Sequence, residues 1–330
     1  MNKVTKISPE TLMRNSKYLN PKMTLKVITQ KQAKTTTAKQ GLIAESINCH
    51  LTNLCNYQCK FCFGRYEKMS NVLTKEGWKK IIDELSECGV KKINFAGGEP
   101  TLLQYLPELI TYSREQGFYV SLISNGTGIN KQFLDKGGKD CHLIGLSVDS
   151  KFAEIENLLG RCLSRRKTTN KNKKSNNKYS HVKMIQEVAS LIHKYNVDLK
   201  LNTTVTNVNW WEDMNNFIGE LNPSRWKVFQ VHPIDGINNN FFKMFGELSN
   251  KHFYHFINKH KGLNPVVETS EMMNQSYCMI TPDGRFYQSS GNRYEYSKPI
   301  LNVGLKNAFD QVTYSLEKFK QRNGDFYEKN

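Results

Sequence analysis

Hydrophobic and polar residues alternate along residues 42–234 in a regular succession of short apolar runs and amphipathic stretches. Short or alternating apolar runs are typical of strands, and apolar positions three and four residues apart are typical of helices. We therefore predict strands at 42–52, 91–96, 119–124, 142–150, 197–205 and 225–233. Helices are predicted at 75–88, 103–116, 131–136, 152–159, 179–195 and 211–221. This alternation predicts an α/β fold with a mainly parallel sheet, as a partial (β/α)6 TIM-like barrel.

The two ends of the chain depart from this pattern. Residues 1–40 are polar and rich in Lys and Thr, so we expect a partly disordered N-terminal extension. Residues 235–330 form a C-terminal extension, with a helix at 249–261, strands at 277–280 and 285–288 joined by a turn, and a helix at 308–322. The predicted barrel core is 41–234.

The net charge of +17 favours an anionic partner such as nucleotide phosphates, nucleic acid or an acidic surface. Part of this charge is local, because residues 161–178 are rich in Lys, Arg and Asn and predict a flexible basic loop. No apolar run reaches the roughly 18 residues of a membrane span. The start of the chain also lacks the apolar core of a signal peptide. We expect a soluble cytoplasmic protein.

Three of the eight cysteines, Cys55, Cys59 and Cys62, stand at the spacing Cys-x3-Cys-x2-Cys. Thiolates at this spacing suit zinc or an iron–sulfur cluster, but a closed site normally has four protein ligands. The next cysteine, Cys88, lies at the end of a predicted helix. We infer a cluster with three protein ligands and one open iron, which indicates chemistry at the metal. From the spacing alone, a structural zinc knuckle or three reduced core thiols remain alternatives.

This spacing resembles the signature of the radical S-adenosylmethionine (SAM) superfamily. The resemblance implies that the open iron of a [4Fe–4S] cluster takes the amino and carboxylate groups of SAM. The reduced cluster would then cleave SAM to a 5′-deoxyadenosyl radical, and Phe61 would lie beside the adenine. Gly97-Gly98-Glu99-Pro100, after the second predicted strand, resembles the element that holds the SAM amino group. Taken alone, this tetrapeptide could also be an ordinary turn.

Polar residues also end the third and fourth predicted strands, where α/β folds place their ligands. Ser124-Asn125-Gly126 ends the third strand, and Ser147 and Asp149 end the fourth. Their hydroxyl and carboxylate groups suit the ribose of SAM. Ordinary turn chemistry at a strand end is the alternative for both positions.

Further motifs resemble the viperin family over roughly residues 42–305. They are Asn48 ahead of the cysteines, Lys92–Pro100, Gly160-Arg161, Lys200-x-Asn202, and the segment Leu221–Gln230, which is the most specific. Viperins are radical SAM enzymes that convert CTP, and in microbial relatives UTP or GTP, to 3′-deoxy-3′,4′-didehydro nucleotides. These products terminate RNA chains and serve antiviral defence. Because the chain lacks the N-terminal amphipathic helix and terminal Trp of animal members, the resemblance favours a microbial member without membrane binding.

The resemblance implies three groups of site residues. Cys55, Cys59 and Cys62 would hold the cluster. Residues expected around SAM are Phe61, Gly97, Gly98, Glu99, Ser124, Asn125, Ser147, Asp149, Arg161 and Asn202. Residues expected around the nucleoside triphosphate are Asn48, Lys92, Lys200, Arg225, Lys227 and Asp283, with the C-terminal extension covering this site. Lys200 is the candidate general acid for loss of the 3′-hydroxyl.

The spacing of Arg225 and Lys227 supports this interpretation independently. Two residues apart on a predicted strand, they face one side, whereas Trp226 faces the other as a core residue. Two cations on one strand face suit a triphosphate, although a solvated strand end would show the same spacing. An electron donor such as flavodoxin or ferredoxin is also implied. We expect a monomer with no stable nucleic-acid partner.

Two other functions fit parts of the sequence. One is a radical SAM enzyme acting on another nucleotide-like substrate in cofactor biosynthesis. Enzymes of the GTP-using kind carry a second cluster near the C-terminus, and Cys278 is the only cysteine after Cys162. The other is a basic RNA-binding protein with a structural metal, although no RNA-recognition or helix-turn-helix pattern is present. Iron content together with SAM cleavage separates the two classes.

Overall fold

The computed structural model describes residues 43–64, 69, 72–163 and 180–325. The predicted N-terminal extension at 1–40 lies outside the described residues, as does most of the predicted basic loop at 161–178. All described residues belong to one compact unit that spans 40–330.

A single sheet organises the described part of the chain. Its first six strands are neighbours in chain order and run parallel to one another. They are β1 (Ser46–His50), β2 (Lys92–Ala96), β3 (Tyr119–Ser124), β4 (Leu143–Ser147), β5 (Asp198–Val205) and β6 (Arg225–Gln230). The predicted α/β fold with a mainly parallel sheet is therefore confirmed.

The C-terminal strands extend this sheet at both edges. The strand β7 (Val266–Glu268) pairs in parallel with β6, and β8 (Cys278–Ile280) pairs in parallel with β1. The strands β9 (Arg285–Ser290) and β10 (Arg293–Pro299) continue from β8 as antiparallel neighbours. The predicted strand pair near 277–288 corresponds to β8 and β9. The strand β7 was missed because it has only three residues, and β10 because its side chains are mostly polar.

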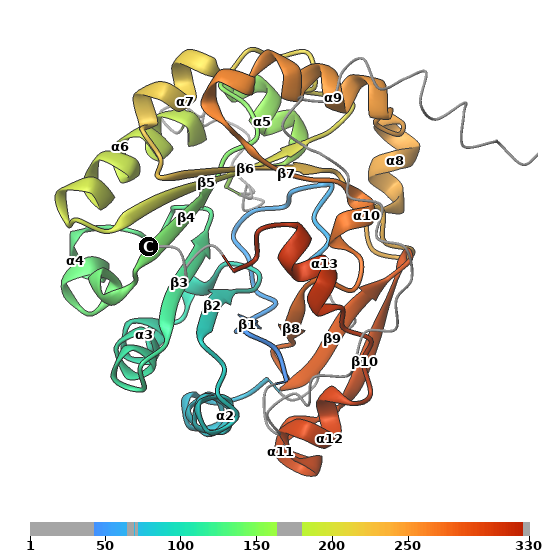
Figure 1. Ribbon diagram of the computed structural model, residues 1–330. Coiled ribbons are helices and arrows are strands. Elements are labelled where there is room, and N and C mark those ends of the chain that lie inside the picture. The colour runs from blue at the N-terminus through green and yellow to red at the C-terminus, as the bar shows by residue number, and fades with distance from the viewer. Residues whose placement is uncertain (1–42, 65–68, 70–71, 164–179, 326–330) are drawn as a thin grey trace, which may run out of the picture. The chain divides into compact units, whose positions relative to one another are not determined.

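Helices cover the outer face of the curved parallel sheet, as Figure 1 shows. In chain order they are α2 (Lys75–Glu87), α3 (Leu106–Glu115), α4 (Lys131–Asp135), α5 (Ala153–Leu159), α6 (His181–Lys194) and α7 (Asn215–Leu221). Side-chain caps define several starts: Thr74, Asn130 and Ser180 each accept a hydrogen bond from the backbone N–H three residues later.

The remaining helices are α8 (Asn239–Phe245), α9 (Asn250–Lys259), α10 (Ser270–Met273), α11 (Ile300–Val303), α12 (Leu305–Phe309) and α13 (Leu316–Gln321). Of these, α8 to α10 lie between β6 and β8, and α11 to α13 follow β10. Single 3-10 turns occur at Pro100–Leu102, Gly138–Asp140 and Lys261–Leu263.

The hydrophobic core lies between the sheet and the outer helices. In α2, the apolar stripe of Trp78, Ile81, Ile82 and Leu85 is fully buried. Burying a large apolar side chain of this kind contributes about 1.5–3 kcal/mol. The other side of the parallel strands faces the inside of the curved sheet, and its side chains are much more polar. The inside of the sheet is therefore the candidate place for a ligand site.

The predicted continuous helix at 308–322 is wrong. The chain leaves α12 after Phe309 and starts α13 at Leu316. Ser315 accepts a hydrogen bond from the N–H of Lys318, and its own N–H donates to the carbonyl oxygen of Gln275. These contacts give the backbone a helix start where the sequence pattern suggested a helix interior. In Figure 1, α13 lies across the opening of the curved sheet.

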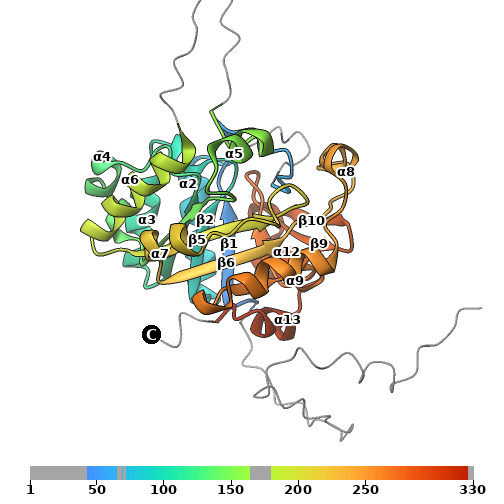
Figure 2. The ribbon, with the colours of Figure 1, turned by 90° about the horizontal axis from the view of Figure 1, so that it is seen from above.

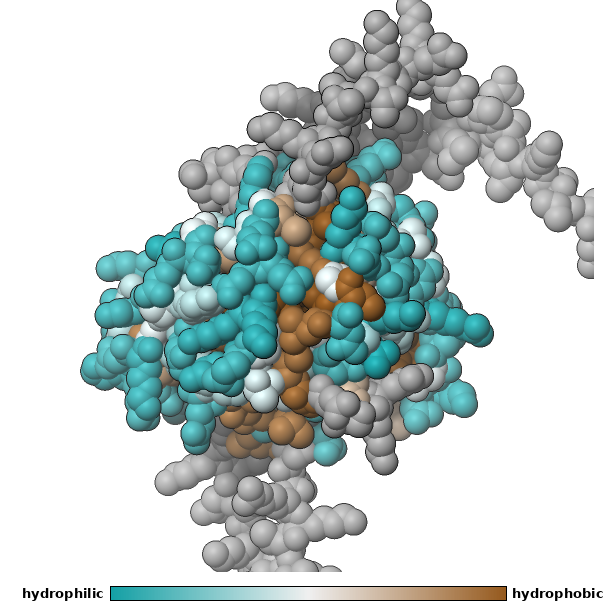
Figure 3. All heavy atoms as spheres, turned by 90° about the horizontal axis from the view of Figure 1, so that it is seen from below, coloured by the Kyte–Doolittle hydropathy of each residue, from teal (hydrophilic) through white to brown (hydrophobic). Residues whose placement is uncertain are grey.

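Figure 2 shows the same arrangement from above, with the parallel strands inside a layer of helices. The face seen in Figure 3 has a narrow band of hydrophobic residues between hydrophilic flanks. Among the described residues, no helix has both the length and the apolar character needed to span a lipid bilayer.

Candidate active site

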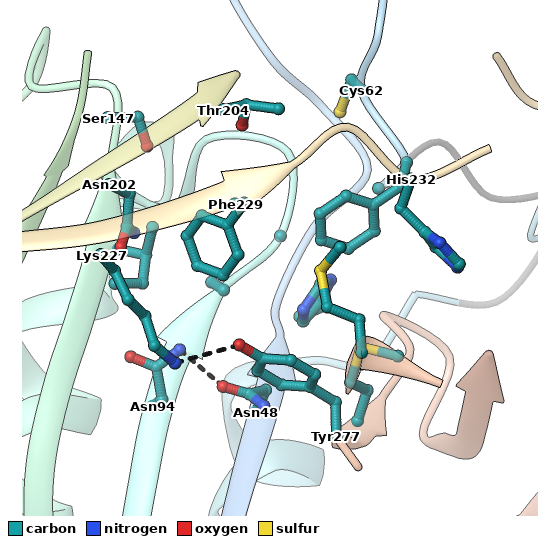
Figure 4. Close-up of a pocket in the computed structure, with 18 of the residues that line it drawn as sticks. Asn48, Cys62, Asn94, Ser147, Asn202, Thr204, Lys227, Phe229, His232 and Tyr277 are labelled. Atoms are coloured by element: carbon teal, nitrogen blue, oxygen red, sulfur yellow. Dashed lines mark hydrogen bonds between the residues drawn. The ribbon is translucent and has the colours of Figure 1, made fainter. Parts of the chain in front are cut away.

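One cavity inside the curved sheet contains nearly all of the predicted site residues. Alternate residues of the parallel strands point into it, as the pleat requires. The three cysteines of the loop after β1 line the cavity together with six Lys or Arg residues: Arg161, and the group of Lys92, Lys200, Arg225, Lys227 and Arg322. In Figure 4, Cys62 lies at one end of the view, and Lys227 and Tyr277 lie toward the other.

The loop that holds the three cysteines is clamped on one side by the Gly97–Glu99 segment. The N–H of Gly98 donates to the carbonyl oxygen of Thr52 at 2.6 Å, and the N–H of Glu99 donates to that of Leu54 at 2.8 Å. A Cβ atom on Gly98 would lie 2.2 Å from the Leu54 oxygen. The glycine is therefore needed for this close backbone approach.

The end of α5 clamps the same loop from the other side. The N–H of Lys60 donates to the carbonyl oxygen of Leu159 at 2.8 Å, and the N–H of Gln58 donates to that of Gly160 at 3.2 Å. Gly160 has a φ of 83°, and a Cβ atom there would lie 2.3 Å from the Gln58 oxygen. The Gly160-Arg161 motif thus shapes the loop that presents the thiols.

A buried side-chain contact also fixes this loop. The hydroxyl of Tyr57 lies 2.9 Å from Nδ1 of His181, whose Nε2 lies 3.0 Å from the carbonyl oxygen of Ser147. Burial lowers the pKa of His181 to about 3, so the imidazole is neutral near pH 7. This contact ties the cysteine loop to the end of β4 and the start of α6.

The three thiols differ in their surroundings. Cys55 is exposed, and Cys59 and Cys62 are half-buried. Burial raises the pKa of the Cys55 and Cys59 thiols, and the nearby Arg161 guanidinium acts in the opposite direction. Among the described residues, no group of three or more His, Cys, Asp or Glu side chains is arranged around a single metal ion.

Glu99 is buried at the cavity wall between β2 and β3. Its Oε1 accepts from Ser124 Oγ at 2.8 Å and from both the hydroxyl and the N–H of Thr101. Its Oε2 accepts only from the N–H of Asn125, at 2.7 Å, and keeps capacity for another donor. Burial raises the pKa of Glu99, while these hydrogen bonds act to lower it.

The structure does not bring Asp149 into the cavity with the other residues predicted around SAM. Asp149 has no exposed surface and is not among the residues that line the cavity. Its Oδ2 accepts from Nε of Arg161 at 2.5 Å, and its Oδ1 accepts from the N–H of Thr204 at 2.8 Å. Arg161 does line the cavity and also lies 3.5 Å from Oε2 of Glu156. Both carboxylate oxygens of Asp149 therefore have protein partners, and one of them holds Arg161, which lines the cavity.

Asp283 is the second predicted residue that lies outside the cavity lining. It lies in the turn between β8 and β9, where it accepts from the Thr281 hydroxyl and from Nε of Arg285 at 2.9 Å. The residue is not part of the cavity lining. Its side chain is engaged by its own turn, so the structure does not bring it to the other predicted substrate residues.

The other predicted residues line the cavity. Asn202 has a buried side-chain oxygen without a hydrogen-bond partner in the described part of the chain, which suits a polar ligand. Asn48 accepts from Nδ2 of Asn94 at 2.8 Å (Figure 4). Asn94 in turn accepts from the Ser121 hydroxyl. Arg225 and Lys227 face the cavity as predicted, whereas Trp226 is buried against Phe256 and His260.

Burial dominates the electrostatics of the lysines. It lowers the pKa of Lys92 and Lys200 well below the usual value and that of Lys227 to about 7, and neighbouring cations add to the effect on Lys92 and Lys200. Because burial disfavours the ammonium forms of these lysines, the pocket suits an anion, whose negative charge favours the ammonium forms again.

Three residues at this end of the cavity were missed from the sequence. Tyr277 receives a hydrogen bond from Lys227 Nζ at 3.2 Å and donates to Oε2 of Glu268. Glu268 forms ion pairs with Lys227 and with Arg322. Tyr277 and Glu268 are at or beside short strands and could have been found only as polar residues in apolar runs. No sequence pattern indicated Arg322 as a site residue, because only the packing of α13 places it at this end of the cavity.

Comparison with known proteins agrees with this geometry. The model of the radical SAM superfamily matches residues 50–218. An S-adenosylmethionine-dependent nucleotide dehydratase of Flammeovirga pacifica is 34% identical over 289 residues, covering 86% of this chain and 95% of that protein. The protein named S-adenosylmethionine-dependent nucleotide dehydratase RSAD2 of Danio rerio is 32% identical over 314 residues, covering 91% of this chain and 84% of that protein.

Among solved structures, native anSMEcpe with bound AdoMet superposes with a TM-score of 0.58 at 16% identity, covering 86% of this chain and 96% of that chain. At this identity the likeness concerns the fold. Fold, cysteine loop and family match together define a radical SAM enzyme. Within that superfamily, the chain belongs to the S-adenosylmethionine-dependent nucleotide dehydratases, the viperin-like enzymes, as its motifs predicted.

Proposed function

We propose that this enzyme converts a nucleoside triphosphate (CTP, UTP or GTP) to its 3′-deoxy-3′,4′-didehydro analogue. The observation that supports this most directly is a single cavity whose lining holds three thiols and six Lys or Arg side chains. Thiols of this spacing suit an iron–sulfur cluster, and clustered Lys and Arg suit phosphates. The names of the relatives support a nucleotide substrate for this chain as well.

The residues present fit the two cofactors. Cys55, Cys59 and Cys62 would each bind one iron of a [4Fe–4S] cluster and leave the fourth iron for SAM. When bound and reduced, the cluster would supply the electron that splits SAM into methionine and a 5′-deoxyadenosyl radical. Oε2 of Glu99 can accept from the SAM ammonium, and Arg161 can donate to its carboxylate. The buried oxygen of Asn202 offers a further acceptor to SAM.

The remaining SAM contacts would come from the loops around these groups. Gly97 and Gly98 let the backbone approach the ligand, and Ser124, Asn125 and Ser147 place polar groups at strand ends. Phe61 lines the cavity, with the Arg161 guanidinium 5.7 Å from its ring centre. These residues would hold the adenosine part of SAM beside the cluster.

The cationic end of the cavity would bind the triphosphate and thereby position the ribose. Lys92, Arg225 and Lys227 offer donors to the phosphates, and Asn48 faces the same space. Anchoring the phosphates holds C4′–H toward the SAM end, so positioning decides which hydrogen is removed. The C4′ hydrogen leaves as an atom, the 3′-hydroxyl leaves with a proton as water, and one added electron completes the double bond.

Lys200 is our candidate for the proton donor in that step. It lines the cavity, and burial lowers the pKa of its ammonium well below the usual value, which makes the ammonium a better acid. A Lys200→Met variant should still bind nucleotide but form no dehydrated product. An active Lys200→Met enzyme would remove Lys200 from this role.

The product lacks a 3′-hydroxyl, so a polymerase that incorporates it cannot extend the chain. A role in antiviral defence follows from this chemistry. A separate one-electron donor, such as flavodoxin or ferredoxin, would reduce the cluster.

The test is anaerobic. The cluster is reconstituted and reduced, SAM is added, and CTP, UTP, GTP and ATP are offered separately while 5′-deoxyadenosine and nucleotide mass are followed. We expect one or two nucleotides to yield a product lighter by one water together with 5′-deoxyadenosine. SAM cleavage that no triphosphate stimulates would reject the substrate and favour another nucleotide-like compound. Failure to bind iron would reject the proposed cofactor.

A further inference from the structure

We propose that the cationic end of the cavity binds the triphosphate without a divalent metal ion. Glu268 sets the net charge of this end of the cavity so that it matches the charge of the metal-free triphosphate. The inference rests on the proposed function, because it concerns the same pocket. It adds the charge state of the substrate that this pocket selects.

The charges at this end match a metal-free triphosphate. Five cationic residues of the described chain line it, and Glu268 is the carboxylate that pairs with two of them. With every group ionised, five positive charges and one negative charge leave a formal charge of +4. A terminal phosphate carries about two negative charges and each inner one about one, so a free nucleoside triphosphate carries about four. Its complex with Mg²⁺ carries only about two.

Glu268 is already committed to protein partners. It is fully buried, its Oε1 pairs with Nζ of Lys227 and lies 3.3 Å from Nη1 of Arg322, and its Oε2 accepts from the Tyr277 hydroxyl. Mg²⁺ in nucleotide sites is usually held by one or two carboxylates together with the phosphates. Here the carboxylate orients two cations toward the cavity, and those cations can neutralise the phosphates directly.

The two guanidinium groups are held in place before any ligand arrives. Nη2 of Arg225 donates to the carbonyl oxygen of Asn323 at 2.9 Å, and Nη2 of Arg322 donates to that of Ser276 at 2.8 Å. Arg322 also lies over the Tyr277 ring. Guanidinium groups held in this way suit phosphate oxygens in a fixed geometry. Such fixed donors supply the orientation that a metal ion gives in other phosphate sites.

The protonation of the lysines supports the same conclusion. Burial lowers the pKa of Lys92, Lys200 and Lys227 and so disfavours their ammonium forms. A tetra-anion favours the ammonium forms more strongly than a dianionic Mg²⁺ complex does. The full charge of the pocket is therefore reached only with the metal-free ligand.

The test measures the dissociation constants of CTP, UTP and GTP for the cluster-loaded enzyme by anaerobic calorimetry, without SAM so that no turnover occurs. Each titration is run with EDTA and again with Mg²⁺ in excess over nucleotide. We expect binding in EDTA and binding weaker on the order of tenfold with Mg²⁺, because half of the ligand charge is lost. Binding that requires Mg²⁺, or that Mg²⁺ strengthens, would overturn this inference and leave the proposed function intact. If none of the three nucleotides binds in either buffer, both fail.

Glu268 is tested by a matched pair of variants. Glu268→Gln raises the formal charge of the pocket by one, so the preference for the metal-free over the Mg²⁺-bound nucleotide should increase. Glu45→Gln removes a carboxylate that pairs with Lys320 of α13 outside the cavity lining, and should leave the ratio unchanged. Lys227→Gln lowers the charge and should shrink the preference. If the ratio is the same in Glu268→Gln and in the wild type, Glu268 does not set the charge of the pocket.

Discussion

The guanidinium of Arg322 lies 3.6 Å from the centre of the Tyr277 ring. Tyr277 directly precedes β8, and Arg322 caps the C-terminal end of α13. The same guanidinium donates to the Ser276 carbonyl oxygen and pairs with Glu268. This contact seats α13 against the cationic end of the cavity and brings Arg322, Asn323 and Gly324 into its lining.

Arg322→Gln should weaken nucleotide binding more than tenfold, because truncating one member of a buried charged pair costs about 2 kcal/mol or more. The measurement is the dissociation constant of each triphosphate. Lys320→Gln is the control, since Lys320 lies on the same helix but is exposed and outside the lining. Arg322→Lys should recover part of the affinity through its charge but not through stacking. Full affinity in Arg322→Gln would place the triphosphate elsewhere.

Gly98→Ala should destabilise the cysteine loop and reduce iron incorporation. The new Cβ would lie 2.2 Å from the Leu54 oxygen, and overpacking of this kind costs about 1–3 kcal/mol. Melting temperature and iron per chain measure the effect. Gly219→Ala, in α7, has open space around its Cβ and should instead raise stability by about 0.5–1 kcal/mol. Equal iron content in Gly98→Ala and wild type would show that the Gly97–Glu99 segment is not needed to hold the cysteine loop.

Asp149→Asn should weaken SAM binding while leaving nucleotide binding and iron content nearly unchanged. The substitution removes the charge that pairs with buried Arg161, and breaking such a pair costs about 3–5 kcal/mol. Part of this cost will appear as lower stability, so SAM affinity is compared with nucleotide affinity in the same preparation. Asp198→Asn, an exposed residue at the start of β5, is the control. Loss of both affinities together would indicate a purely structural role for Asp149.

Nucleotide affinity should fall as the pH rises from about 7 to about 9, above the pKa of the terminal phosphate. Burial lowers the pKa of Lys227 to about 7 and lowers those of Lys92 and Lys200, and a bound triphosphate raises them again. Binding therefore takes up protons in this range. Lys227→Arg should flatten the profile, because arginine does not titrate there. A wild-type affinity independent of pH would contradict the lysine shifts.

The same pKa shifts of the lysines should make the free enzyme more stable as the pH rises, whereas they make nucleotide binding weaker. The pKa of each lysine is lower in the folded than in the unfolded chain, so the unfolded chain binds more protons between the two values. Free-enzyme stability therefore gains a contribution as the pH rises from about 7 toward about 10. Thermal melts with and without nucleotide should show that the difference between the two melting temperatures becomes smaller as the pH rises across this range.

Local sequence patterns predicted the six central strands and their helices because those elements bury one apolar face each. The Arg225–Lys227 face was predictable for the same reason, since the strand period alone separates it from Trp226. The position of Asp149 outside the cavity lining was not predictable, because a carboxylate at a strand end can face the ligand or the residue behind it. Only the position of Arg161 decides between these two orientations.

The sequence by itself determined the family, the parallel α/β fold and the cysteine loop, because each depends on residue spacing within short segments. Tertiary structure alone decided how α13 seats Arg322 on Tyr277 and how Glu268 pairs with Lys227. Those relationships join segments far apart in the chain. They depend on how the C-terminal strands and helices pack around the sheet, and no local pattern encodes that packing.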